Sequence, residues 1–301
     1  MTDTLATRMG GVLVPATTPF DPVTGEVAPV SMRENLRRWL ADGADGIVLF
    51  GSTGEGVLLD DDEKRRLTAL AREVVPAGVP LLGGAGADSL RATLRQCHIL
   101  AESGVDAVLI HPPPYFGPYL SAEAMRVYFE AVADGSPVPV VLYHMPKFTH
   151  VTLEPALVAE LVRHPNVVGL KDSSGDLKRL AEYSDACGER CRLLVGNGTL
   201  MYTALELGCA GGILAVALLA MKDCAEIVRH HRAGESQAAG KVQERIAPVH
   251  REVVATWGAV GVKAGLDLLG LAGGPPRPPL RPLGAREQKQ VARVMQGAHL
   301  L

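Results

Sequence analysis

The chain has 301 residues, of which 47% are apolar and 21% are charged, a composition typical of a globular protein. The formal net charge of −3 argues against a nucleic-acid or polyanion binder, which would need a basic face. No basic, then apolar, leader is evident, and the longest apolar run, Gly211–Met221, is too short to span a bilayer. The five cysteines match no metal or redox spacing, so we expect a reduced, cytoplasmic protein.

Short runs rich in Val, Ile and Leu alternate along the chain with longer segments of helical periodicity. The predicted strands are Gly11–Ala16, Gly46–Phe50, Pro80–Gly84, Ala107–His111, Val138–Tyr143, Val167–Lys171, Arg192–Gly196 and Gly211–Val216. The predicted helices between them are Val30–Asp42, Asp62–Val75, Ser89–Glu102, Ala122–Ala133, Glu154–Arg163, Leu177–Ala186 and Met201–Leu207. The spacing of Asp60 and Glu63 predicts a capping box at the start of the second helix.

Strands that are apolar throughout, each followed by a helix, predict a parallel sheet covered on both faces. Eight such units favour a (β/α)8 TIM barrel over residues 1–220. A doubly wound open sheet is the main alternative, but Pro15–Phe20 lacks the glycine-rich turn that often follows its first strand. Residues 221–301 predict a C-terminal helical extension. Its predicted helices are Met221–Ala233, Ser236–Val254, Val260–Leu269 and Ala285–Gln296.

Lys171 ends an apolar strand, where its ammonium group would be costly to bury. A lysine there commonly extends its long stem to solvent. If buried, its amine is favoured in the free form, which can attack a ketone and form a Schiff base. The C-terminal ends of barrel strands form the active site, so Lys171 is the predicted nucleophile. Lys147 is a weaker rival, because it follows a proline in a loop.

The segment Gly51–Gly56 follows the second strand and places the hydroxyls of Ser52 and Thr53 among unhindered backbone amides. Such a nest suits a carboxylate or a phosphate. The same segment is also typical of a loop in which Ser52 or Thr53 caps a helix.

Tyr143 ends the fifth strand and could relay a proton to and from a reacting oxygen, or be an amphipathic rim tyrosine. Neighbours along a strand face opposite ways, so His144 should point into the layer between barrel and helices. Asp172 could stabilise a cationic Lys171 or cap the next turn, and we favour capping. No metal site is expected, since His230 and His231 are adjacent on a helix and diverge.

Three stretches of the sequence resemble the signatures of a known family: Gly51–Glu55, Tyr143-x-x-Pro146 and Gly169–Ser173. They are similar to those of class I pyruvate-dependent aldolases, the family of dihydrodipicolinate synthase and N-acetylneuraminate lyase. Supporting matches are Thr18–Phe20, Gly211–Ile213, Val262–Ala264 and Leu268–Gly270. The resemblance spans nearly the whole chain. It implies a cofactor-independent lyase that acts on a small 2-oxo acid and assembles as a homotetramer, a dimer of dimers.

The resemblance also implies residue roles. Lys171 would form the Schiff base with the keto carbon of pyruvate or another 2-oxo acid, and Tyr143 would be the general acid and base at the C4 oxygen. Ser52 and Thr53, with amides near Gly51, would hold the carboxylate and position Tyr143. The predicted substrate-binding set is Gly51, Ser52, Thr53, Tyr115, Asn197 and Ile213. The protonated imine itself withdraws electrons from C3, so no metal or organic cofactor is implied.

The sequence departs from the synthase pattern at two positions. Synthases carry an arginine five residues after the strand-five tyrosine, which binds the carboxylate of the second substrate. Phe148 stands there and cannot make that bidentate contact, which leaves Lys147 as the neighbouring cation. In the synthases, a partner subunit inserts a tyrosine into the proton relay, and Phe116 stands at that position here. Three alternatives stay open: Tyr115 serves instead, the relay is shorter, or water completes it.

The segments Ser136–Tyr143 and Asn166–Arg179 most resemble the 4-hydroxy-2-oxoglutarate aldolase branch. We therefore expect a lyase that cleaves such a 4-hydroxy-2-oxo acid through a lysine imine and an enamine. One alternative is a 4-hydroxy-tetrahydrodipicolinate synthase, which condenses pyruvate with aspartate semialdehyde. Others are a sugar-acid dehydratase and a non-catalytic 2-oxo acid sensor. A sensor would need neither Lys171 nor Tyr143.

Overall fold

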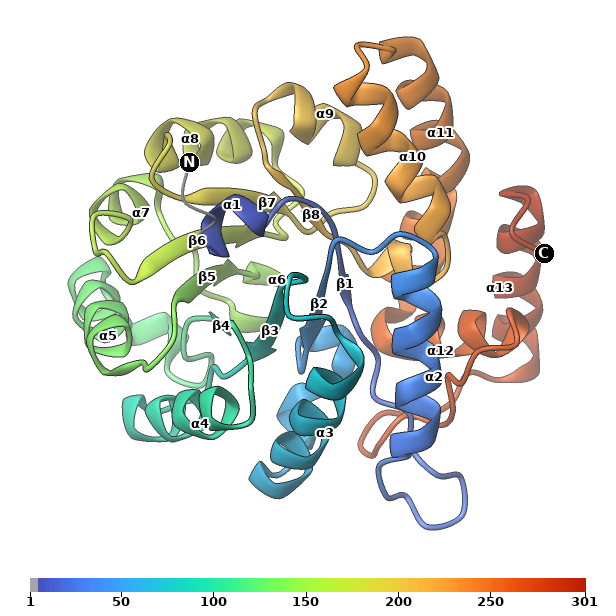
Figure 1. The fold of residues 1–301 in the computed structure, drawn as a ribbon, viewed down its shortest axis with the longest axis horizontal. Helices are drawn as coiled ribbons and strands as arrows, with labels where there is room; N and C mark the ends of the chain where they lie inside the picture. Colours follow the sequence, from blue (N-terminus) through green and yellow to red (C-terminus); the bar gives the residue numbers. More distant parts are fainter. Residues whose placement is uncertain (1–4) are drawn as a thin grey trace.

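The fold is a closed barrel of eight parallel strands, seen in a computed structural model that describes residues 5–301 (Figure 1). The strands are β1 (Gly11–Pro15), β2 (Gly46–Leu49), β3 (Leu81–Gly84), β4 (Ala107–Ile110), β5 (Val140–His144), β6 (Val167–Asp172), β7 (Arg192–Val195) and β8 (Gly211–Ile213). Each strand pairs with its neighbour in sequence, and β8 closes on β1. The predicted (β/α)8 barrel is therefore confirmed, and the open-sheet alternative is wrong.

The strands are linked by helices that form an outer ring (Figure 1). These helices are α2 (Pro29–Ala41), α3 (Asp61–Val74), α4 (Leu90–Glu102), α5 (Ala122–Gly135), α7 (Pro155–Leu161), α8 (Leu177–Cys187) and α9 (Met201–Glu206). The capping box is confirmed, since the Glu63 amide donates to Asp60 Oδ1 over 2.8 Å and the Asp60 amide donates to Glu63 Oε2 over 3.0 Å. The short helices α1 (Leu5–Arg8) and α6 (Pro146–Thr149) escaped prediction because four residues show no periodicity.

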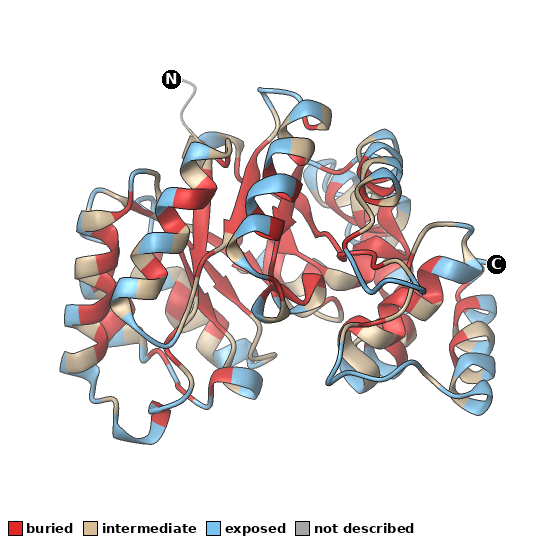
Figure 2. Ribbon diagram, turned by 90° about the horizontal axis from the view of Figure 1, so that it is seen from below, coloured by how far each residue is buried: buried red, intermediate tan, exposed pale blue. Residues whose placement is uncertain are grey.

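The strands separate two apolar layers, and they are buried along most of their length (Figure 2). One cluster, which includes Leu13, Leu109, Tyr143 and Ile213, fills the barrel interior. The larger cluster lies between the strands and the helices. Successive residues of a strand face opposite layers. The predicted strand over Gly211–Val216 is too long, because β8 ends at Ile213 and residues 215–218 form a 3-10 turn.

The C-terminal segment is helical, as predicted. Its helices are α10 (Met221–Arg232), α11 (Ser236–Val249), α12 (Ala255–Leu268) and α13 (Ala285–Gly297), with a π-helical turn at residues 250–254. The predicted third helix starts too late, because α12 begins before a kink at Gly258. Buried residues of the barrel and of these helices share one core cluster. The division of the chain into a barrel over residues 1–220 and an extension over residues 221–301 stays a prediction. None of the helices described here is long and apolar enough to cross a membrane.

Candidate active site

Lys171 and Tyr143 are neighbours on adjacent strands, paired in the register of β5 and β6. The ammonium nitrogen of Lys171 lies 4.2 Å from the centroid of the Tyr143 ring, and the two residues are 5% and 4% exposed. Within residues 5–301, neither the Lys171 Nζ nor the Tyr143 hydroxyl has a hydrogen bond or a carboxylate partner. A buried amine without an ion pair, beside a phenol, is suited to attack a carbonyl group.

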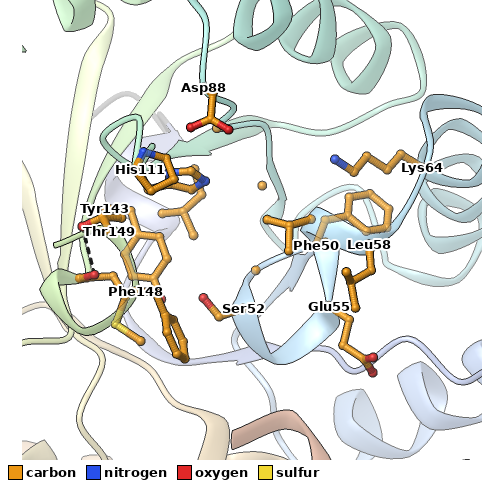
Figure 3. Close-up of a pocket in the computed structure, with 18 of the residues that line it drawn as sticks. Phe50, Ser52, Glu55, Leu58, Lys64, Asp88, His111, Tyr143, Phe148 and Thr149 are labelled. Carbon is orange, nitrogen blue, oxygen red and sulfur yellow. Dashed lines mark hydrogen bonds between the residues drawn. The ribbon is translucent and has the colours of Figure 1, made fainter. Parts of the chain in front are cut away.

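Tyr143, but not Lys171, lines a cavity of about 520 Å³ (Figure 3). Its walls come from β3 to β5, from the loops after β2 to β5, from Lys64 of α3, and from Pro279 and Leu280 of the C-terminal segment. Tyr143, Gly51 and Ser52 line it, and the Ser52 hydroxyl is directed into it (Figure 3). The cavity therefore lies at the C-terminal end of the barrel, where barrel enzymes hold their substrates.

The turn at residues 52–54, here termed the nest, leaves backbone amides without acceptors among the described residues. The amide of Gly54 donates to the Gly51 carbonyl over 3.0 Å, which closes a 3-10 turn. The amides of Ser52 and Thr53 have no acceptor in the part of the chain that the structure describes. Neither hydroxyl caps α3, because Asp60 does so, and the capping alternative is wrong. Two unbonded amides and a hydroxyl can hold a carboxylate.

His144 and Asp172 form a hydrogen-bonded pair on the other face of the same two strands. His144 Nδ1 lies 2.7 Å from Asp172 Oδ1, and the imidazole packs edge-on against Tyr183. Asp172 also accepts from the Ser174 amide over 3.1 Å and from the Ser174 hydroxyl over 2.9 Å. The predicted outward direction of His144 and the capping contacts of Asp172 are confirmed, although the pair itself was not foreseen.

Several predicted substrate residues lie away from the cavity. Thr53 does not line it, and neither Ser52 nor Thr53 hydrogen-bonds to Tyr143. Tyr115 is 78% exposed and stacks edge-on against Phe116. The Asn197 side chain accepts from the Thr199 amide over 2.9 Å, and Ile213 packs inside the barrel. The Tyr115 relay is therefore not assembled within this single chain.

Lys147 does not replace an arginine in the cavity. Its Nζ donates to the Ala255 carbonyl over 2.9 Å, outside the residues that form the walls. Phe148 lines the cavity instead, at 50% exposure, together with Met145, Leu58 and Phe50. Figure 3 shows Phe148 beside Tyr143, on the same side of the cavity, so this part of the wall is apolar.

The cavity is also lined by four titratable residues that were not predicted as site residues: Glu55, Lys64, Asp88 and His111. Burial lowers the pKa of Lys64 to about 8, and its Nζ donates to Gln96 Oε1 over 3.0 Å. Burial also lowers the pKa of His111. One signal was available, since Lys64 shares the buried stripe of α3 with Leu67. The described residues include no cluster of three His, Cys, Asp or Glu side chains that could hold a metal.

The fold and the site place the chain among (β/α)8-barrel lyases. It belongs to the dihydrodipicolinate synthetase family, whose sequence profile matches residues 8–298. The chain is 31% identical over 291 residues to the 4-hydroxy-tetrahydrodipicolinate synthase of Acidiphilium cryptum, which covers 97% of this chain and 99% of that one. It is likewise 31% identical over 275 residues to the synthase of Methanopyrus kandleri, with 91% of each chain covered.

Solved structures agree with the family assignment. The dihydrodipicolinate synthase of Acinetobacter baumannii, solved with pyruvate, superposes with a TM-score of 0.92 at 27% identity. That match covers 97% of this chain and all of the other. A synthase from Bacillus anthracis superposes with a TM-score of 0.91 at 28% identity, and covers 95% of this chain and 97% of its own. The chain is therefore an enzyme of this family.

Proposed function

We propose that this enzyme is a class I aldolase that binds a 2-oxo acid as an imine on Lys171. The observation that carries the proposal is the buried, unpaired amine of Lys171 against Tyr143, beside a cavity at the C-terminal end of the barrel. A binding protein would need neither the amine nor the phenol. Ser52 and the free amides of the nest would take the carboxylate of the 2-oxo acid.

The proposed reaction proceeds through an imine and an enamine. The Lys171 amine adds to the keto carbon, and loss of water leaves the imine. The protonated imine draws electrons from C3, so a C3 proton leaves and an enamine forms. The enamine carbon attacks an aldehyde, and Tyr143 donates a proton to the developing C4 oxygen. Cleavage is the reverse of this sequence, and water finally hydrolyses the imine and frees Lys171.

Two finer functions compete. The names of the relatives favour 4-hydroxy-tetrahydrodipicolinate synthesis from pyruvate and aspartate semialdehyde. Phe148 lies on an apolar part of the wall, and the residues that line the cavity include no arginine. This disfavours a second substrate with a carboxylate at that point. The other candidate is therefore cleavage of a 4-hydroxy-2-oxo acid such as 4-hydroxy-2-oxoglutarate. A comparison of kcat/KM for synthesis with aspartate semialdehyde and for cleavage of 4-hydroxy-2-oxoglutarate decides between them.

Borohydride trapping tests the shared chemistry. The enzyme is incubated with pyruvate and borohydride, digested, and analysed by mass spectrometry. We expect one pyruvyl adduct, on Lys171, and none in Lys171→Ala. Lys147→Ala is the matched control and should trap pyruvate as the wild type does, because Lys147 points to the Ala255 carbonyl. An unmodified Lys171 in the wild type would sink the proposal.

We also propose a homotetramer built as a dimer of dimers, in the cytoplasm. Exposed apolar side chains lie on the loops after β2 and β4, including Val57, Tyr115, Phe116 and Tyr119, and a second copy of the chain would cover them. All five cysteines are free thiols, which suits a reducing compartment. Sedimentation velocity tests the assembly, and a monomer at micromolar concentration would contradict it.

A further inference from the structure

A buried ion pair ties the nest to the C-terminal helices. The Glu55 carboxylate, 3% exposed, meets the Lys263 ammonium of α12, 1% exposed. Lys263 also donates to the Pro275 carbonyl over 2.9 Å, and Glu55 Oε2 accepts from the Arg277 amide over 2.8 Å. Burial lowers the pKa of Lys263, and the Glu55 charge opposes that shift. Neither residue takes part in the proposed chemistry.

The segment at residues 272–280, here termed the C-terminal strap, is held on both sides. Asn35 of α2 exchanges two hydrogen bonds with Ala272, at 2.8 and 3.0 Å. Arg277 donates to both carboxylate oxygens of Glu63 over 2.6 and 2.7 Å, and to the Leu58 carbonyl over 3.0 Å. The strap therefore binds the residues that flank the nest, and its Pro279 and Leu280 form part of the cavity wall.

Phe20 lies between the two cations of this assembly. Its ring centroid is 4.3 Å from Lys263 Nζ and 4.3 Å from the Arg277 guanidinium carbon. Cations on an aromatic face are held by the ring quadrupole, and the attraction strengthens when water is excluded. The loop after β1, the turn after β2 and the C-terminal strap are thus joined at one buried point.

Glu55 occupies a strained backbone position. Its φ of 54° and ψ of 32° lie in the left-handed region, which costs a non-glycine residue about 1 kcal/mol. The turn packs tightly against the end of β2, where a Cβ at Gly56 would lie 2.0 Å from the Phe50 carbonyl oxygen. On its other side, the Thr18 hydroxyl donates to the Gly54 carbonyl over 2.7 Å. The Glu55 side chain reaches the α12 lysine from this strained position, and the ion pair opposes relaxation of the turn.

We infer that Lys263 is a positioning residue for the carboxylate site and acts through Glu55 on the turn at residues 52–54. The inference rests on the proposed function, in which that turn holds the carboxylate of the 2-oxo acid. Loss of the ion pair releases the strained residue, and the two free amides then lose their common direction. Binding of the 2-oxo acid weakens, while the imine chemistry of Lys171 and Tyr143, on other strands, is kept.

The variants Glu55→Gln, Lys263→Met and the double variant test this role. Each is assayed for the KM of pyruvate, for kcat, for pyruvate trapping at saturation and for the melting temperature. We expect the KM for pyruvate to rise about tenfold in each single variant, the loss of roughly one good hydrogen bond, with kcat within about threefold. The double variant should show the KM of a single variant, because the two residues act as one unit. Full trapping at saturating pyruvate should persist.

Val291→Ala is the matched control. Val291 is fully buried in α13, a helix that contributes no residue to the strap, the nest or the cavity wall, so its truncation should lower the melting temperature alone. If the Glu55 and Lys263 variants lower the melting temperature but leave KM unchanged, as this control should, the positioning role is overturned. Glu55→Gln, which keeps its size, carries the test if Lys263→Met does not fold. No pyruvate adduct in the wild type would instead overturn the proposed function, and this inference with it.

Discussion

His144 and Asp172 pair directly behind Tyr143 and Lys171, since each couple occupies consecutive positions in the register of β5 and β6. The inner couple faces the barrel interior and the outer couple faces the helices. Asp172 serves His144 and the turn at Ser174 at the same time, which fixes the end of β6. The strand that carries Lys171 is therefore anchored from its helix-facing side.

Asp172→Ala should lower the free energy of unfolding by about 2 kcal/mol, because it leaves the buried His144 and the half-buried Ser174 without their acceptor. Lys171 keeps its place in the barrel, so pyruvate trapping should persist, though more slowly. Urea unfolding measures the first effect and timed borohydride trapping the second. Glu154→Ala, which removes only an exposed ion pair with Arg179, is the comparison. Equal stability of the two variants would contradict this account of the pair.

Tyr143→Phe separates imine formation from bond cleavage. The ring that packs against Lys171 is retained, and only the hydroxyl is lost. Pyruvate trapping should stay within a few-fold of the wild type, while aldol turnover falls by about 10² to 10³, the range that a general acid supplies. Coupled pyruvate detection measures turnover. Turnover near the wild-type rate would remove Tyr143 from the proposed mechanism.

The barrel was predictable because its signals are local. Each strand is an apolar run that ends in turn residues, and each long helix shows a 3.6-residue stripe. Alternation along β5 was enough to place Tyr143 inside and His144 outside.

The site was less predictable because its walls come from distant segments. Glu55 meets Lys263, and the wall near Phe148 includes Leu280, contacts that no periodicity reports. Asn197 and Ile213 stand at strand ends, which made them candidates, yet one caps its own loop and the other packs in the barrel. Strand position selects a face of the molecule, whereas the direction of a side chain in a loop depends on tertiary contacts.

Phe148→Arg should improve the use of aldehydes that carry a carboxylate. Phe148 lines the cavity near Tyr143, so an arginine there would add a bidentate partner to an apolar wall. We expect kcat/KM for aspartate semialdehyde to rise by about tenfold, with the KM for pyruvate within twofold. Lys147→Arg is the control, because residue 147 points to the Ala255 carbonyl and should leave both constants unchanged. A fall in kcat/KM for the charged aldehyde would contradict the apolar wall as the barrier.

The stability of the protein should depend on pH through Lys64. Burial lowers its folded-state pKa to about 8, below the value of about 10.4 expected in the unfolded chain. Between these values the unfolded state binds the proton and the folded state does not, so the free energy of unfolding rises with pH across that window. Below pH 8 both states are protonated and the full cost of the buried charge remains.

Lys64→Met should therefore stabilise the protein at pH 7 by up to about 3 kcal/mol relative to its effect at pH 10. Urea unfolding of both proteins at the two pH values measures this difference, in which other titrating groups cancel. Lys178→Met, at an exposed position, should show no such dependence. If the two proteins differ in free energy of unfolding by the same amount at both pH values, the prediction is wrong. The Lys64 amine would then be as well solvated in the folded protein as in the unfolded chain.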